Sequence, residues 1–181
     1  MKSVLLFLFF LPVLGTSYCW SQSPEGDSLE WSPSRKLTWA DFRAEPVRNS
    51  ETVASTNTSL GVDFHLRNNK LEFTIHCLFT KSKSWGMVKT DYVLQHEQGH
   101  FDIAEVFARK LFKQLGEYQF NSRSYKADLD KIYNNIVKEK TAMQDQYDRE
   151  TDHSRIREKQ LEWLKKIDDM LEAYKDYAGY H

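Results

Sequence analysis

Two stretches of the chain alternate apolar and polar residues, at positions 55–67 and 71–79. Successive side chains of a strand point to opposite faces, so the apolar members of each stretch share one face. These members are Leu60, Val62, Phe64 and Leu66, then Leu71, Phe73, Ile75, Cys77 and Phe79. The polar run at 68–70 between them predicts a turn, and hence a β-hairpin with one buried face. His65 and His76 fall on the opposite face, which favours solvent-side residues over metal ligands.

Three later stretches carry apolar residues at helical spacing. The first runs from Asp91 to about Leu115, where Thr90 or Asp91 can cap it and Gly116 can end it. The next two are marked by Leu129, Ile132, Ile136, Met143 and Tyr147, then by Ile156, Trp163, Ile167, Leu171 and Tyr174. The sequence therefore predicts an α+β fold, with a small antiparallel sheet or hairpin followed by three helices.

The first residues have the pattern of a secretory signal peptide. One positive charge precedes an apolar run at 4–14 that is too short to span a bilayer. Cleavage after Ser21 is favoured over cleavage after Ser17, and both leave small residues at the positions that define a cleavage site. We expect a signal peptide at residues 1–21, a single domain at residues 22–181, and a secreted or periplasmic protein without a transmembrane anchor.

Charge and cysteine content narrow the possible classes of protein further. Lys and Arg number 25 against 26 Asp and Glu, and they intermix along the chain, so no basic surplus predicts nucleic-acid binding. Loss of Cys19 with the signal peptide would leave Cys77 without an intrachain partner, as a small buried thiol. The segment 31–42 is rich in large apolar side chains, which favours an arm anchored in the core over a platform for carbohydrate or peptide.

The first predicted helix contains the sequence His96-Glu97-Gln98-Gly99-His100, which matches the HExxH pattern of zinc peptidases. Four residues of helix place the two imidazoles about 40° apart around the axis and about 6 Å apart along it. Both can therefore bind one cation. Glu97 lies beside them, where a carboxylate can take a proton from a metal-bound water.

A third protein ligand has to come from elsewhere in the chain. Asp102 and Glu105 point well away from His100 on a regular helix, by about 200° and 140°. No glycine or proline follows His100 until Gly116, which excludes a third histidine on a glycine turn. The segment 147–153 is the only later one that combines a histidine with several carboxylates.

Helix length leaves two alternatives for this third ligand. A helix that returns alongside the first one reaches the level of the metal about 16 Å before His153. Either the returning helix starts later, or it stops near Tyr147 with a bend, and so delivers His153, or an earlier residue such as Asp148 is the ligand. The bend and His153 are favoured, because imidazole suits zinc and because Thr151 and Asp152 are weak helix formers.

A set of motifs is spread over nearly the whole chain after the signal peptide. They are Trp31, LTWADF at 37–42, Thr56, Ser84-Trp85, HEQGHFDIAE at 96–105, YDRETDH at 147–153, Gln160 and Trp163. In these motifs the chain resembles a family, the predicted secreted zinc-dependent proteases of the DUF922 group. The resemblance implies that His153 belongs to the site and that Asp148 and Thr151 support it, while Ser154 stands where the family motif usually has glycine.

These features together predict an exported zinc metallopeptidase with a zincin-like metal-site helix. His96, His100 and His153 would hold one Zn²⁺, a zinc-bound water would attack the peptide bond, and Glu97 would be the general base. The alternative is a zinc-stabilised, non-catalytic binding module of the cell envelope, and a hydrolase of non-peptide amides is a third class. The expected partner is a peptide or protein substrate that pairs with an edge of the small sheet.

Overall fold

Two long antiparallel strands form the base of the structure, β3 (Thr58–Arg67) and β4 (Lys70–Thr80). Their register pairs Leu60 with Cys77 and Phe64 with Phe73, so the apolar residues of both strands share one face. The short β1 (Ser28–Glu30) adds to the other edge of β4 and gives the order β1-β4-β3. The predicted hairpin is confirmed. The computed structural model describes residues 26–67 and 70–180, and the predicted signal peptide at 1–21 lies outside them.

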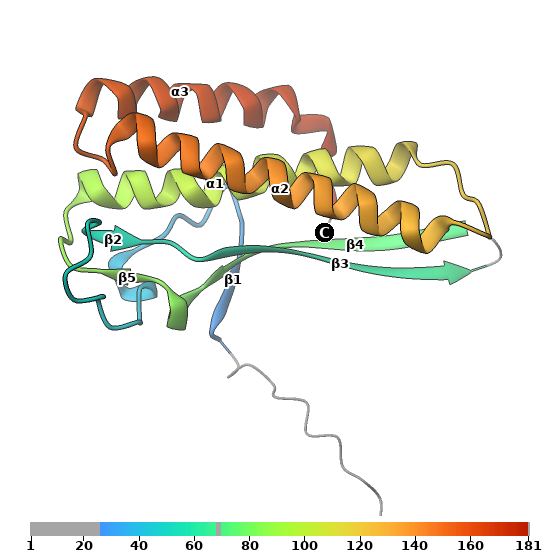
Figure 1. Cartoon of the computed structure of the whole chain (residues 1–181), viewed down its shortest axis with the longest axis horizontal. Coiled ribbons are helices and arrows are strands. Elements are labelled where there is room, and N and C mark those ends of the chain that lie inside the picture. Colours follow the sequence, from blue (N-terminus) through green and yellow to red (C-terminus); the bar gives the residue numbers. More distant parts are fainter. Residues whose placement is uncertain (1–25, 68–69, 181) are drawn as a thin grey trace, which may run out of the picture.

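Three helices lie on the apolar side of this hairpin, the first two next to the strands and the third stacked beyond them (Figure 1). They are α1 (Asp91–Glu117), α2 (Tyr125–Thr151) and α3 (Arg157–Ala173). The Thr90 side chain caps α1 by accepting a hydrogen bond from the Val93 N–H, as the sequence predicts. Because α1 packs against the hairpin on one side and against α2 and α3 on the other, its middle is the most deeply buried part of the molecule. The α+β architecture is therefore confirmed.

The stretch at 55–67 is not one continuous strand, contrary to the prediction. The chain leaves the hairpin at Asn57, whose N–H donates to Ser84 Oγ at 2.9 Å. Before this point, β2 (Ala54–Ser55) pairs with β5 (Trp85–Gly86) in a second, two-stranded sheet. Trp39 packs over Gly86 so closely that a Cβ atom there would lie 2.4 Å from its ring. This second sheet brings residues 52–56 to the first turns of α1.

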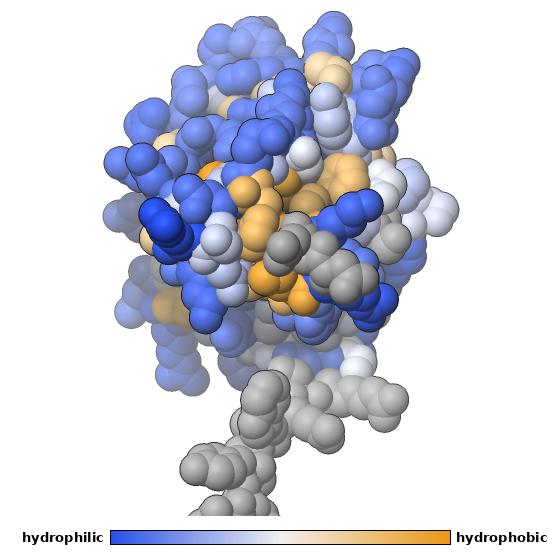
Figure 2. Space-filling model, turned by 90° about the vertical axis from the view of Figure 1, so that its right-hand side faces the viewer, coloured by the Kyte–Doolittle hydropathy of each residue, from blue (hydrophilic) through white to orange (hydrophobic). Residues whose placement is uncertain are grey.

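The outer half of the hairpin is less buried than its alternation predicts. Leu60, Ile75 and Cys77 are buried, whereas Phe64 and Leu66 are 38% and 44% exposed. Figure 2 shows the apolar surface that gathers at this end of the molecule. The two predicted solvent-side histidines do lie on the opposite face. His65 is exposed, and His76 is half-buried between Glu30 and Asp63, where the hydrogen bond with Glu30 raises its pKa.

The aromatic arm before β2 belongs to the core. Trp31, Leu37 and Phe42 are buried, and the Trp31 indole N–H donates to Asp102 Oδ1 at 2.6 Å. Asp102 therefore binds the arm on the side of α1 that faces away from the histidines, as its predicted angle requires. Cys77 is buried with its thiol free, and burial raises its pKa well above the usual value. Among residues 26–67 and 70–180, no helix has both the length and the apolar composition to cross a bilayer.

Candidate metal centre

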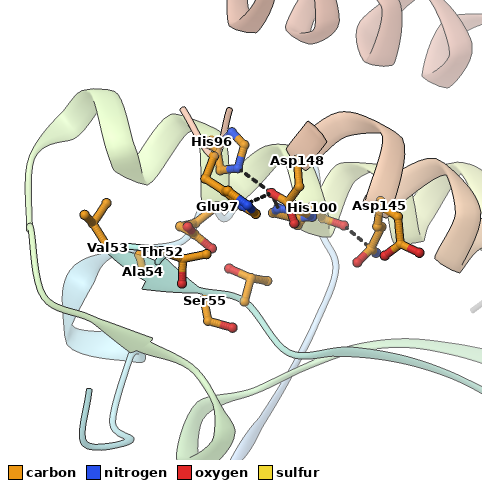
Figure 3. Close-up of a pocket in the computed structure, with 12 residues that line it drawn as sticks. Thr52, Val53, Ala54, Ser55, His96, Glu97, His100, Asp145 and Asp148 are labelled. Carbon is orange, nitrogen blue, oxygen red and sulfur yellow. Dashed lines mark hydrogen bonds and ion pairs between the residues drawn. The ribbon is translucent and has the colours of Figure 1, made fainter. Parts of the chain in front are cut away.

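His96 and His100 lie on one face of α1 and direct their rings to the same point. Both are buried, with ring centroids 5.0 Å apart and planes nearly perpendicular. His96 Nε2 lies 3.0 Å from Asp148 Oδ1, and His100 Nε2 lies 3.1 Å from the same oxygen. Figure 3 shows this carboxylate reaching down from α2 between the two rings. The predicted convergence of the two imidazoles is therefore present in the fold.

Tyr147 packs against the imidazole rings of both His96 and His100 and holds them in place. Its ring stacks on His96 at a centroid distance of 4.4 Å and meets His100 edge-on at 5.0 Å. Its hydroxyl donates to the His96 carbonyl oxygen at 3.3 Å. Trp163 of α3 packs on the far side of the Tyr147 ring at 5.4 Å, so all three helices contribute to holding the histidines. A fixed orientation of this kind lowers the entropic cost of binding a ligand.

Gly99 is required where α1 meets Tyr147, and Gly99→Ala should destabilise the protein. A Cβ atom there would lie 2.6 Å from the Tyr147 hydroxyl oxygen, and Tyr147 is fully buried and cannot move aside. We expect a loss of about 1–3 kcal/mol in the free energy of unfolding, the usual scale of overpacking, measured by denaturant titration. Gly116→Ala is the matched control, because nothing lies within 4 Å of its Cβ position. Equal stability of the two variants would contradict the close approach.

Asp148 reaches the site from within α2, which continues to Thr151, so the predicted end of this helix with a bend near Tyr147 is wrong. Gln144 Nε2 donates to the His100 carbonyl oxygen at 3.3 Å, so residue 144 of α2 lies beside residue 100 of α1. Asp148 lies one turn further along and faces both imidazoles directly. The side chain of Thr151 donates to the Tyr147 carbonyl oxygen and stabilises this last turn.

His153 arrives at the same place through a left-handed turn after α2. Asp152, His153 and Ser154 all have positive φ, of 48°, 49° and 75°. This run folds the chain back, and His153 Nδ1 lies 3.3 Å from Asp148 Oδ1. Within the described ranges, the side chains whose ligand atoms all lie within 4.8 Å of one another are His96, His100 and Asp148. His153 is adjacent to this set and lies at its solvent side, with a side chain 32% exposed.

The protonation states of His96 and Asp148 suit a cation, whereas at His100 burial is outweighed by the hydrogen bond with Asp148, which raises the pKa of this imidazole. Burial lowers the pKa of His96 to about 4, so its imidazole is neutral and has a lone pair to offer. Burial opposes ionisation of Asp148, but hydrogen bonds from His100 and His96 outweigh it and hold the pKa of its carboxyl well below the usual range. In tetrahedral zinc sites, ligands about 2.0–2.1 Å from the metal lie about 3.3 Å from one another. The nitrogen–oxygen distances of 3.0 and 3.1 Å are close to that spacing, and the donor set fits zinc.

Glu97 lies beside the three converging groups and does not join them. Its side chain is buried, and burial raises the pKa of its carboxyl. Within the part of the chain that the structure describes, its Oε2 has no hydrogen-bond partner. A buried carboxyl oxygen without a partner is costly unless it serves a ligand or a reaction. The carboxyl therefore has the location and the free oxygen that proton transfer needs.

All of these groups line one polar pocket of about 130 Å³. His96, Glu97 and His100 form its back, and Asp145, Asp148 and His153 form one wall. The segment 52–56, which includes β2, forms the opposite wall (Figure 3). Of the five residues in this wall, only Thr56 belongs to the motifs on which the family resemblance rests. No residue type in the segment signals chemistry by itself, although the Thr56 hydroxyl interacts with Glu97 and offsets part of the rise in its pKa that burial causes.

Comparisons with known proteins give a single finding. Searches of curated proteins and of solved structures produced no significant match. A family model described as "Bacterial protein of unknown function (DUF922)" matches residues 31–154, from the buried arm to the left-handed turn after α2. The match covers more than half of the 181 residues and includes every residue of the metal centre. The chain therefore belongs to the DUF922 family.

Proposed function

We propose that this protein is an exported zinc-dependent metallopeptidase. The observation that carries the proposal is the convergence of His96, His100 and Asp148 with the buried, unpartnered oxygen of Glu97 beside them in a pocket that reaches the surface. Export rests on the signal-peptide pattern at residues 1–21. The HExxH face of α1 would then be a zincin-like metal-site helix, with the rest of the fold holding it rigid.

We assign His96, His100 and Asp148 as the residues that hold zinc. Their ligand atoms lie closest together, and Asp148 contributes a negative charge that offsets part of the charge of the ion. His153, the ligand favoured by the sequence, lies 3.3 Å from Asp148 Oδ1 and would orient that carboxylate. When bound at this centre, zinc supplies Lewis acidity, lowering the pKa of a coordinated water to about 7 and polarising a carbonyl group.

Glu97 is the general base in this proposal. Its carboxylate takes one proton from the water that adds to the peptide carbonyl carbon, and it passes this proton to the amine nitrogen as the C–N bond breaks. The products are a carboxylic acid and an amine, the acid then gives its proton to the amine or to solvent at neutral pH, and Glu97 ends in its starting state. Burial suits this role because a raised pKa brings the carboxyl closer to the pKa of an activated water.

The second candidate is a zinc-stabilised binding module without catalysis. It is favoured by the proximity of His153, since a fourth protein ligand closes a site in the way that structural zinc centres are closed. Against it stands Glu97, because a structural centre has no use for a buried carboxyl that makes no hydrogen bond through Oε2. Metal content alone does not separate the two candidates, whereas turnover does.

The test is metal content and peptide hydrolysis by the purified protein. We expect one zinc per chain by elemental analysis and cleavage of a random peptide library, read by mass spectrometry. Cleavage should disappear on chelation and return with stoichiometric zinc. A fully loaded protein that cleaves no peptide would favour the binding module, and a protein that takes up no zinc would contradict both candidates.

A further inference from the structure

The Asp145 carboxylate lines the metal pocket and has no role in the centre described so far. It lies one turn before Asp148 on α2, where side chains start about 5–6 Å apart, and it is exposed at the mouth. Figure 3 shows it on the side of Asp148 that faces away from Glu97. Among residues 26–67 and 70–180, its carboxylate makes no hydrogen bond or ion pair. It is therefore free to bind a positively charged group.

The same pocket has a second feature that points to a bound substrate. Glu97 is 3% exposed, and its Oε2 has no hydrogen-bond partner within the described ranges. Buried polar atoms normally have partners, so this oxygen indicates that a polar molecule enters the pocket. The pocket volume of about 130 Å³ holds about four water molecules at about 30 Å³ each. The space suits one small residue of a substrate and excludes a longer stretch of chain.

The pocket is closed just beyond Asp145. Gln144, the preceding residue, donates through Nε2 to Thr58 Oγ1 at 3.2 Å and to the His100 carbonyl oxygen at 3.3 Å. Lys140, one turn earlier on α2, donates through Nζ to the Thr58 carbonyl oxygen at 3.0 Å. These bonds join α2 to the start of β3. A substrate chain cannot continue along α2 past this point, so the group that meets Asp145 is an end of the chain.

Building on the proposed function, we infer that Asp145 binds the free amino group of a peptide substrate, which makes the protein an aminopeptidase. In a first residue, the amino nitrogen lies about 2.5 Å from the carbonyl carbon of the bond to be cleaved. Both can therefore fit in one small pocket, with the carbonyl carbon beside Glu97 and the amino group at Asp145. Water adds to this carbon, the C–N bond breaks, and the first residue leaves as a free amino acid.

Two other chain groups fit Asp145 less well. A terminal carboxylate has the same sign of charge as Asp145 and is repelled, which argues against removal of residues from the carboxyl end. A lysine side chain carries its charge on a flexible four-carbon stem, which needs more space than the closed end of the pocket offers. Asp145 is thus a specificity-determining residue for the amino end of the substrate.

The experiment measures the binding of three tetrapeptides to zinc-loaded Glu97→Gln protein, which leaves a substrate intact. The probes are tetra-alanine with a free amino group, acetylated tetra-alanine and acetyl-lysyl-trialanine, each with a fluorescent label at its carboxyl end. By fluorescence anisotropy, the free peptide should bind about tenfold more tightly than both others, the scale of one charge-assisted hydrogen bond. Equal binding of free and acetylated tetra-alanine, or binding of neither, would overturn the inference. Acetyl-lysyl-trialanine that binds as tightly as the free peptide would assign Asp145 to a basic side chain instead.

Substitutions of Asp145 test whether this residue is the cause of the preference. Asp145→Asn should remove the tenfold difference, and Asp145→Glu should keep part of it, because only the second retains the charge. Neither change removes a contact among the described residues, so zinc content should stay the same. Asp168→Asn is the matched control, exposed on α3 and outside the pocket, and it should leave the difference intact. A preference that survived Asp145→Asn would contradict the assignment.

Turnover by the zinc-loaded protein with Glu97 intact separates this inference from the proposed function. Mass spectrometry should show single residues lost from the amino end of tetra-alanine, and acetylation should lower kcat/KM by at least about tenfold. Cleavage of the acetylated peptide at an equal rate would retain the peptidase and overturn the aminopeptidase. Binding of free tetra-alanine that depends on Asp145 but leads to no cleavage would contradict the peptidase and leave Asp145 as the site of the amino group.

Discussion

Glu97→Gln is expected to lower peptide turnover by at least about 100-fold while zinc remains bound. The amide has nearly the shape of the carboxylate, but it cannot accept the proton that the attacking water must lose. Metal content should not change, because Glu97 is not among the groups whose ligand atoms converge, which are His96, His100 and Asp148. The measurement is kcat on a peptide identified from the library, with zinc determined on the same sample.

A matched control separates this effect from a general loss of charge. Glu158→Gln makes the same chemical change at an exposed position on α3, away from the pocket, and should leave both turnover and zinc unaltered. If zinc-loaded Glu97→Gln protein turned over as fast as Glu158→Gln protein, the proton-transfer role of Glu97 would be lost, and with it the proposed mechanism.

The second large effect concerns the metal. His96→Ala and His100→Ala should each abolish stoichiometric zinc, because each removes one of the two buried imidazoles among the three converging groups. Asp148→Ala should do the same, since it removes the third converging group and leaves the remaining site without its negative charge. His153→Ala should weaken binding by about 10–100-fold, the usual effect of losing a residue that orients a ligand, and should retain full occupancy at excess zinc.

Zinc affinity measured by competition with a chelator distinguishes these variants. His65→Ala on the exposed face of the hairpin is the control and should bind as the starting protein does. The reverse order, with His153→Ala losing all zinc and Asp148→Ala keeping it, would restore His153 as the third ligand. In that case the carboxylate of Asp148 would be the orienting group.

Local patterns in the sequence are sufficient for most of the secondary structure. Period-two alternation predicts the hairpin, and helical spacing with a threonine cap predicts α1. The placement of His96, Glu97 and His100 on one face of a helix follows from helix geometry alone. Asp102 and Glu105 are correctly turned away for the same reason, since Asp102 binds the Trp31 indole and Glu105 binds Arg109. Each of these conclusions depends on neighbours within a few residues along the chain.

The break between β2 and β3 is a feature that local sequence patterns do not predict. Alternation continues through residue 57, and only the hydrogen bond from Asn57 to Ser84, 27 residues later, turns the chain toward β5. The exposure of Phe64 and Leu66 likewise depends on where the helical layer ends relative to the hairpin. Neither feature has a signal in the residues themselves, because each is set by a partner that is distant in sequence.

The third converging group is the sharpest case. The sequence by itself determined that two imidazoles share a helix face with a carboxyl beside them, and it pointed to residues 147–153 for a further group. Only the tertiary structure decided which side chain of that segment faces the imidazoles, because the level at which α2 passes α1 is set by packing along both helices, from Gln144 at the His100 carbonyl oxygen to Tyr147 against Gly99. A prediction that misplaces α2 along α1 by a few residues therefore puts His153, instead of Asp148, opposite the two imidazoles. The sequence states directly which side chains are available, whereas the position of one packed helix along another results from many contacts acting together.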